Sequence, residues 1–169
     1  VIDGSATIAL NCKPAFHSYR FIEKKPAHQA ELEKLIGKHP NGHLARVSKG
    51  TAQDLLPMTL MGLDWTSWRG VLFLDPFGLQ VTWPLLQQVA ATKALDVFFL
   101  VSLSGLYRQA ALKESAIDEG KAAKLTNFLG TSDWRDAIYT REQADLFDGP
   151  QRSRDTGWRD ILQFTTERL

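Results

Sequence analysis

The strongest strand signal of this chain is Gly70-Val71-Leu72-Phe73-Leu74-Asp75, which is followed by Pro76-Phe77-Gly78. Its first part is continuously apolar, which is typical of a strand that lies inside a parallel sheet with helices on both faces. Its second part stops the strand, because Pro76 has no amide hydrogen and biases Asp75 toward an extended conformation. The stretch therefore predicts a buried parallel strand that ends in an acidic residue.

Outward from this strand, apolar runs of strand length alternate with stretches of helical period, which indicates βαβ units and an α/β fold. Downstream, a helix is expected from Trp83 to Lys93 and a buried strand from Leu95 to Ser102. Upstream, the expected elements are a truncated strand at Val1 to Asp3, a helix around Thr7 to Asn11, a strand at Tyr19 to Glu23, a helix at Ala27 to Lys38 and a strand at His43 to Ser48. Helices are also expected at Glu119 to Leu129 and Trp158 to Leu169.

Length and composition favour one compact domain. The chain has 169 residues, 44% of them hydrophobic, and a formal net charge of +1, so no strong charge points to a partner. We expect a single domain over 1–169, with its core at about 1–106 and a helical C-terminal part at about 107–169. Cys12 is the single cysteine, and no run approaches the roughly 20 apolar residues of a membrane span. A cytoplasmic protein is expected, and the opening Val1-Ile2-Asp3-Gly4 suggests a piece of a longer product.

Acidic residues end the first two expected strands, and another follows the third. Ligands of parallel sheets bind outside the carboxyl ends of the strands, where Asp3, Glu23 and Asp54 are expected. An acid after the second strand is the usual acceptor for the ribose hydroxyls of an adenosine cofactor, and Asp54 is suited to accept from the adenine amino group. Alternatively, these acids are helix caps and turn formers.

The end of the fourth strand, Asp75-Pro76-Phe77-Gly78, resembles the Asp/Asn-Pro-Pro-Tyr/Phe motif of amino-methyltransferases. In that motif the acid and a proline carbonyl hold the amino group, and the aromatic ring stacks on its base. The resemblance implies that Asp75, Pro76, Phe77 and Gly78 orient a methyl acceptor. The chain departs from the motif, because Phe77 replaces the second proline and Gly78 replaces the aromatic residue. The alternative is a turn with no role beyond ending the strand.

Several segments together resemble the three-Cys-motif partner protein family. They are Ile2-Asp3-Gly4, Ser5-Ala6, Phe21-Ile22-Glu23, Leu74-Asp75-Pro76-Phe77-Gly78 and Phe128-Leu129-Gly130-Thr131-Ser132-Asp133-Trp134-Arg135. The resemblance implies a Rossmann-like class I methyltransferase fold, S-adenosylmethionine as cofactor, a bacterial source and a three-cysteine-motif protein as partner. Asp3, Gly4, Glu23 and Asp54 are the expected cofactor-binding residues.

Two departures from the family affect these expectations. Family members resemble Asp-Gly-Phe-Ala-Gly-x-Gly after the first strand, whereas here Gly4 is followed directly by Ser5. We expect a glycine loop to be missing from the sequence at this point, so that Gly4 and Ser5 lie much further apart than the usual 3.8 Å or so between neighbouring Cα atoms. The family also continues beyond the position of Leu169.

Other candidate sites have weaker support. His39 and His43 flank a Pro-Asn-Gly turn that is unsuited to holding a metal ion, so no metal site is expected. Ser102-Leu103-Ser104-Gly105 lacks the pattern of a nucleophile elbow. The five tryptophans of the chain, and the arginines of its C-terminal third, are able to meet nucleic acid. Packing roles and a solvated surface are the favoured interpretation, and Trp134 is expected to pack on the domain.

Two classes of function remain. The first is an enzyme that methylates an amino group of nucleic acid or protein, with Asp75 to Gly78 orienting the acceptor. The second is a non-catalytic binding module that partners a three-cysteine-motif protein. An intact glycine loop favours the enzyme, and its absence favours the module.

Overall fold

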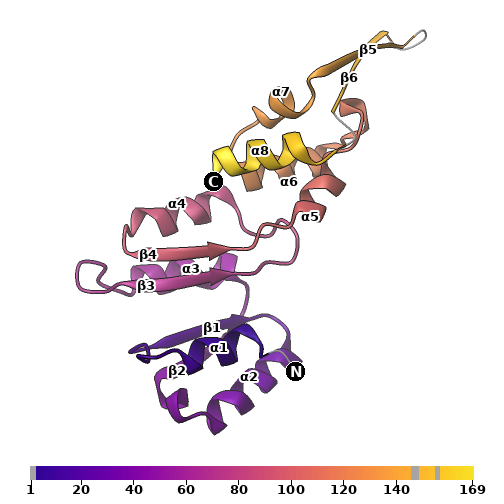
Figure 1. Ribbon diagram of the computed structural model, residues 1–169. Coiled ribbons are helices and arrows are strands. Elements are labelled where there is room, and N and C mark those ends of the chain that lie inside the picture. Colours follow the sequence, from indigo (N-terminus) through magenta and orange to yellow (C-terminus); the bar gives the residue numbers. More distant parts are fainter. Residues whose placement is uncertain (1–2, 146–148, 155–156) are drawn as a thin grey trace. The chain divides into compact units, whose positions relative to one another are not determined.

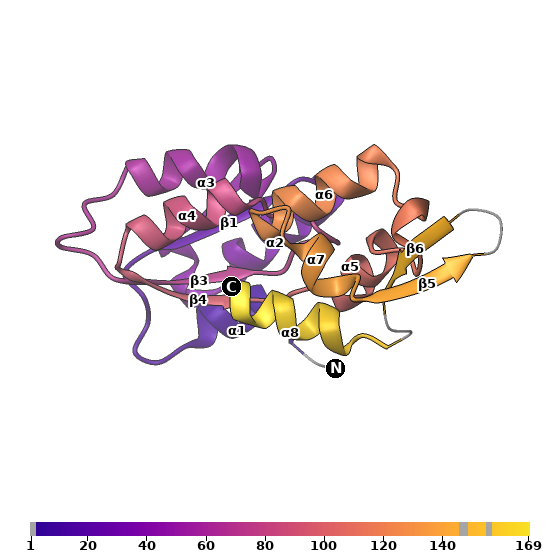
Figure 2. The ribbon, with the colours of Figure 1, turned by 90° about the horizontal axis from the view of Figure 1, so that it is seen from above.

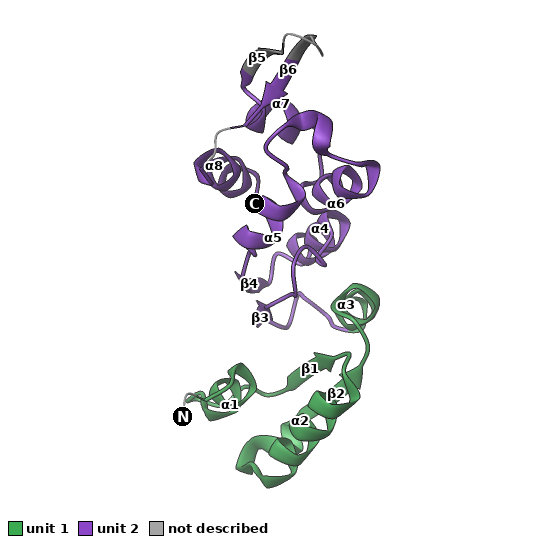
Figure 3. Cartoon of the chain, turned by 90° about the vertical axis from the view of Figure 1, so that its right-hand side faces the viewer, with its two compact units in different colours: residues 1–62 green, residues 63–169 purple. Residues whose placement is uncertain are grey.

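The computed structural model describes residues 3–145, 149–154 and 157–169 (Figure 1). The chain forms two compact units, Val1–Gly62 and Leu63–Leu169, which Figure 3 shows in different colours. Each unit is an assembly of helices around a pair of parallel strands. The chain is therefore an α/β protein, as its alternating sequence pattern predicts.

The first unit is built on a parallel pair of strands joined by a helix. Its elements are α1 Ser5–Asn11, β1 Tyr19–Glu23, α2 Pro26–Lys38, β2 Ala45–Lys49 and α3 Ala52–Met61, with a 3-10 helix at Pro40–Leu44. Strands β1 and β2 pair in register from Tyr19 opposite Ala45 to Glu23 opposite Lys49. Helix α2 begins at Pro26, where the missing amide hydrogen costs nothing, and ends before His39 and Pro40. The predicted strand at Val1 to Asp3 lies mostly outside the described residues, and Asp3 itself has irregular backbone.

A small apolar core holds the first unit together. Its buried members are Leu10 from α1, Tyr19 from β1 and Ala45 from β2. Partly buried apolar residues pack against this cluster, among them Ile36 of α2. Asn41 donates from Nδ2 to the Leu10 carbonyl at 2.9 Å, so the turn after α2 satisfies a carbonyl near the end of α1. This core fixes α1 and α2 against the strand pair.

The second unit contains the other parallel pair and most of the helices. Its elements are β3 Gly70–Leu74, α4 Trp83–Ala91, β4 Leu95–Phe99, α5 Leu103–Gln109, α6 Glu119–Leu129, α7 Trp134–Ile138, β5 Arg141–Asp145, β6 Gly149–Ser153 and α8 Arg159–Arg168, with a 3-10 helix at Glu114–Ala116. Strands β3 and β4 pair from Gly70 opposite Leu95 to Leu74 opposite Phe99. Strands β5 and β6 form an antiparallel hairpin, with Arg141 opposite Ser153 and Asp145 opposite Gly149.

The β3–β4 pair is covered less completely than its sequence predicts. Leu74 and the α4 residues Leu85 and Val89 are buried, and Figure 1 shows α4 running along the pair. Val71 and Phe73 point to the opposite face, because successive side chains of a strand alternate, and both are exposed. The prediction of helices on both faces is therefore not met within this unit, whose described residues leave that face open.

The C-terminal helices share one core with the end of β4. Leu106 of α5, Phe128 of α6, Ile138 at the end of α7 and Ile161 of α8 are buried together, and the ring of Phe99 lies 5.9 Å from that of Phe128. Figure 2, seen from above, shows α5, α6, α7 and α8 gathered at the side of the unit where β4 ends. The helical segment that follows residue 106 thus packs with the strand pair of the second unit. One domain over 1–169 stays a prediction.

None of the helices within the described ranges has the length and apolar character needed to cross a bilayer. The longest, α2, has 13 residues.

The end of α6 requires a glycine. Gly130 adopts φ 72°, in the left-handed region, and its amide donates to the Thr126 carbonyl at 2.8 Å. The indole of Trp83 occupies the space where a Gly130 side chain would lie. The Arg168 guanidinium lies 4.0 Å from the centre of the Trp83 ring. Arg168 Nε also donates to the Leu129 carbonyl at 2.9 Å. Residues from α4, α6 and α8 therefore meet at this one turn.

We expect Gly130→Ala to lower the free energy of unfolding by about 2 kcal/mol or more, because the new methyl group overlaps Trp83 and the backbone is strained. Gly37→Ala is the matched control: it lies inside α2, its added methyl meets no atom within 4 Å, and a helical Gly→Ala change stabilises by roughly 0.5–1 kcal/mol. Urea denaturation of both variants measures the two effects. Equal stability of wild type and Gly130→Ala would contradict the assigned packing.

Candidate functional site

The carboxyl edge of the β1–β2 pair carries Glu23. Because the strands are parallel and in register, Glu23 lies beside Lys49 at the point where both strands end. The Glu23 carboxylate accepts from the Lys25 amide through Oε1 at 2.7 Å, and its Oε2 lies 3.7 Å from His28 Nδ1. Its side chain is 27% exposed. These contacts fix the carboxylate at the edge of the sheet and leave further lone pairs open to a ligand.

Asp54 has a structural role at the start of α3. Thr51 is the N-cap residue, and its hydroxyl accepts from the Asp54 amide at 3.2 Å and donates to Asp54 Oδ2 at 2.6 Å. This reciprocal pair is a capping arrangement, the alternative that the sequence leaves open for the acids after the strands. An adenine contact of the exposed Asp54 stays a prediction.

Asp3 and Gly4 precede α1 and are both exposed. Gly4 is the N-cap residue, and its carbonyl accepts from the Ile8 amide at 3.1 Å. The helix therefore begins directly after Gly4, so the expected separation of Gly4 from Ser5 by an intervening glycine loop is wrong for this structure. A side chain at Gly4 would meet nothing within 4 Å, so no protein contact explains the glycine.

The carboxyl edge of the β3–β4 pair carries Asp75, which is exposed and forms no hydrogen bond or ion pair with the described residues. The pairing ends beside it, with the Leu100 amide donating to the Leu74 carbonyl at 2.8 Å. Phe77, two residues on, is 84% exposed. A carboxylate that has no hydrogen bond with the described residues thus lies two positions before an exposed aromatic ring. This combination is suited to holding an amino group on a planar ring.

The turn that follows Asp75 lies against the start of α5. Gly78 adopts φ 69°. A β-carbon added to Gly105 would lie 3.4 Å from the Gly78 Cα. Ser102 caps α5 by accepting from the Gly105 amide at 3.1 Å, and its hydroxyl lies 3.3 Å from that of Ser104. Parallel pairing therefore brings the Asp75–Gly78 turn and the Ser102–Gly105 segment to one edge.

The predicted site residues divide between the two units. The first unit holds Asp3, Gly4, Glu23 and Asp54, and the second holds the turn Asp75–Gly78. Parallel pairing brings the end of β1 close to the residue after β2, as the hydrogen bond of 3.1 Å from the Gly50 amide to the Glu23 carbonyl shows.

Sequence reasoning missed an apolar hollow of about 490 Å³ in the second unit, lined by Leu103, Ser104, Tyr107, Arg108 and Trp158. The spacing of Leu103 and Tyr107 is the helical signal that could have revealed its α5 wall, but this segment follows a strand predicted to run to Ser102. Helix α5 was therefore not expected.

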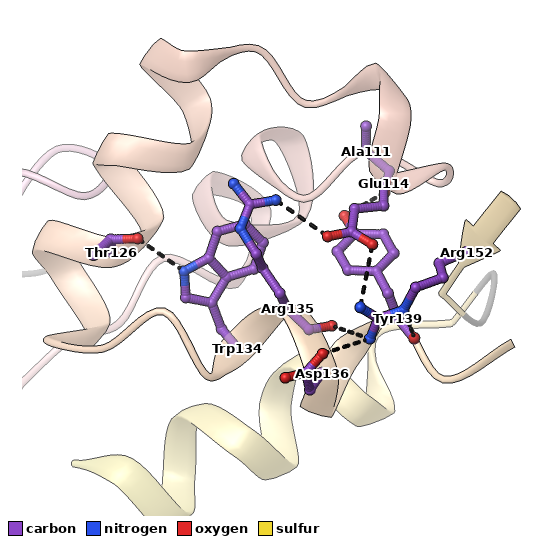
Figure 4. Close-up of polar contacts among 8 residues, drawn as sticks. All are labelled: Ala111, Glu114, Thr126, Trp134, Arg135, Asp136, Tyr139 and Arg152. Atoms are coloured by element: carbon purple, nitrogen blue, oxygen red, sulfur yellow. Dashed lines mark hydrogen bonds and ion pairs between the residues drawn. The ribbon is translucent and has the colours of Figure 1, made fainter.

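The segment around Trp134 is part of the core. Trp134 is fully buried, which confirms the prediction that it packs on the fold, and its Nε1 donates to Thr126 Oγ1 at 3.0 Å (Figure 4). The Arg135 guanidinium lies 4.6 Å from the centre of the Trp134 ring and donates to Glu114 Oε1 at 3.2 Å. Arg152 of β6 completes the network, with contacts of 3.5 Å to Glu114 Oε2 and 2.8 Å to Asp136 Oδ1. This segment therefore ties α6, α7 and β6 together.

The histidines around the Pro40 turn are used locally. His39 accepts from the Asn41 amide at 3.1 Å and its other ring nitrogen lies 3.0 Å from Asn11 Oδ1, while His43 Nδ1 lies 2.9 Å from the Pro40 carbonyl oxygen. Within the described part of the chain, no three histidine, cysteine or acidic side chains are grouped so as to hold a metal ion.

Comparison of the chain with protein families, with curated proteins and with solved structures finds no match. Its functional interpretation therefore depends on the residues and geometry described above.

Tyr139 makes stability depend on pH at the alkaline end. Burial raises the pKa of its phenol from the usual 10.0 to about 12, and its hydroxyl donates to the Ala111 carbonyl at 2.7 Å. The unfolded chain releases this proton near pH 10 while the folded chain keeps it. Tyr139 therefore contributes stability that is fully present below pH 10 and is lost as the pH rises toward 12.

We expect the difference in unfolding free energy between wild type and Tyr139→Phe to shrink between pH 10 and pH 12. Below pH 10 the variant should be less stable by roughly 1 kcal/mol, the value of one hydrogen bond. Denaturant titrations at a series of pH values measure the difference. A constant difference across this range would show that the phenol titrates alike in both states.

Proposed function

We propose that this chain is an S-adenosylmethionine-binding, Rossmann-like protein of the class I methyltransferase type, similar to the three-Cys-motif partner family, that methylates an amino group. One observation carries the proposal: acids stand at the carboxyl ends of both parallel pairs, Glu23 as the last residue of β1 and Asp75 directly after β3. Acids at strand ends are where cofactors and substrates of α/β proteins are recognised.

Glu23 suits the ribose of the cofactor. Its carboxylate is held by the Lys25 amide and remains partly exposed, so it is ordered before any ligand arrives. A carboxylate with open lone pairs accepts hydrogen bonds from two neighbouring hydroxyls. Asp3, Gly4 and Asp54 are proposed to complete the cofactor site, with Asp54 also capping α3.

Asp75 suits the acceptor amine. Bound S-adenosylmethionine would supply an electrophilic methyl group: a C–N bond would form as the C–S bond breaks, the electron pair leaving with the thioether sulfur and the proton of the amine passing to solvent. Asp75 would accept a hydrogen bond from the amine and aim its lone pair, an effect of positioning. The exposed Phe77 ring would pack on a planar group that bears the amine.

The second candidate is a non-catalytic partner of a three-cysteine-motif protein. It is favoured by the direct Gly4–Ser5 junction, which leaves out the glycine loop, and by the exposed apolar face of Val71 and Phe73. Transfer of labelled methyl groups from S-adenosylmethionine to nucleic acid or protein distinguishes the two candidates, because a module transfers none.

Glu23→Ala should weaken S-adenosylmethionine binding by roughly 1.5–3 kcal/mol, the range for a hydrogen bond to a charged group. Isothermal titration calorimetry measures the change, with Glu31→Ala on the exposed surface of α2 as the matched control. Equal affinities of wild type and Glu23→Ala would remove Glu23 from the site. Absence of binding to the wild type would remove the cofactor.

Asp75→Asn keeps the shape of the side chain and one acceptor oxygen, so we expect normal folding and cofactor binding with methyl transfer reduced about tenfold or more. Asp75→Ala should reduce transfer further. Asp96→Asn, an exposed acid on β4, is the control that should leave transfer unchanged. Full activity of both Asp75 variants would assign the turn a purely structural role.

A further inference from the structure

The apolar hollow of the second unit combines exposed aromatic rings with a cation. Leu103, Ser104, Tyr107 and Arg108 belong to α5, and Trp158 precedes α8. Figures 1 and 2 both show α5 and α8 as neighbours. Trp158 is 55% exposed and Tyr107 40% exposed, although large aromatic side chains usually gain by burial. At about 490 Å³ the hollow has the size of an ordinary small-molecule site.

Tyr107 lies against a buried arginine. The Arg154 guanidinium lies 4.1 Å from the centre of the Tyr107 ring. Arg154 is itself buried, with Nε donating to the Ala110 carbonyl at 2.8 Å and Nη1 to the Gly157 carbonyl at 3.4 Å. A fixed ring backed by a cation is ready to stack without the loss of side-chain freedom that binding otherwise costs.

The charge of the hollow selects its ligand. Arg108 is exposed and makes no ion pair or hydrogen bond with the described residues, and the lining residues include no carboxylate. Arg159, next to Trp158, is likewise exposed. Flat apolar rings flanked by arginine match a ligand with flat rings and negative charge, which is the chemistry of a nucleic-acid strand with unpaired bases.

We propose that this hollow binds single-stranded nucleic acid, with a base on Trp158 and Tyr107 and a neighbouring phosphate on Arg108. That the bound strand is also the methyl acceptor rests on the proposed function. The binding itself needs no cofactor, so its failure and the failure of S-adenosylmethionine binding are separate results.

Fluorescence polarisation with labelled single-stranded oligodeoxythymidine and oligouridine at low salt tests the proposal. Trp158→Ala should weaken binding at least about fivefold, the lower end of the effect of one stacked base. Arg108→Ala should weaken binding. The slope of log affinity against log salt concentration should become less steep by about the amount that one phosphate contact contributes. Trp68→Ala and Arg20→Ala, exposed residues outside the hollow, are the matched controls and should bind as wild type does.

Circular dichroism and thermal unfolding of each variant establish that it is folded. If Trp158→Ala is unstable, Trp158→Phe serves instead and should retain part of the affinity, because a smaller ring still stacks. The proposal is overturned if the wild type binds neither oligonucleotide, or if the control variants lose as much affinity as the hollow variants. It is also overturned if a labelled peptide of alternating Glu and Trp binds in a Trp158-dependent way while the oligonucleotides do not.

Discussion

Parallel pairing of strands is the constraint on which the rest of this structure depends. A parallel pair needs a crossover between its strands, which α2 provides for β1 and β2 and α4 for β3 and β4. The same geometry puts both carboxyl ends at one edge, so Glu23 lies beside the residues that follow β2, and the Asp75 turn lies beside the start of α5. The proposed chemistry uses these two edges.

The local elements were largely predictable, because their signals are local. The strand Tyr19–Glu23 and the helix Glu119–Leu129 have the bounds that their local sequence patterns predict. The apolar run from Leu95 was predicted to continue to Ser102, but β4 ends at Phe99 because the Ser102 hydroxyl accepts from the Gly105 amide and starts α5. No helix is expected from the sequence at α3, although Asp54 is offered there as either an adenine acceptor or a helix cap; in the structure it pairs with the N-cap residue Thr51.

The contacts that give residues their roles were less predictable, because they join distant parts of the chain. Gly130 is required by Trp83, which comes from α4, and the partner of Arg135 is Glu114, which lies 21 residues earlier. The segment from Phe128 to Arg135 therefore belongs to the core of the second unit. Asp75 contrasts with it, because no described residue engages its carboxylate.

If the carboxyl ends of β1 and β2 bind S-adenosylmethionine, as we propose, the cofactor should perturb the backbone there, and two-dimensional NMR during a titration with the cofactor measures this through the amide chemical shifts. The largest shifts should fall at 24–25 and 50–55, the backbone that follows the two strands. Absence of shifts at saturating cofactor would contradict it, as would shifts confined to the amino ends of the strands around Tyr19 and Ala45.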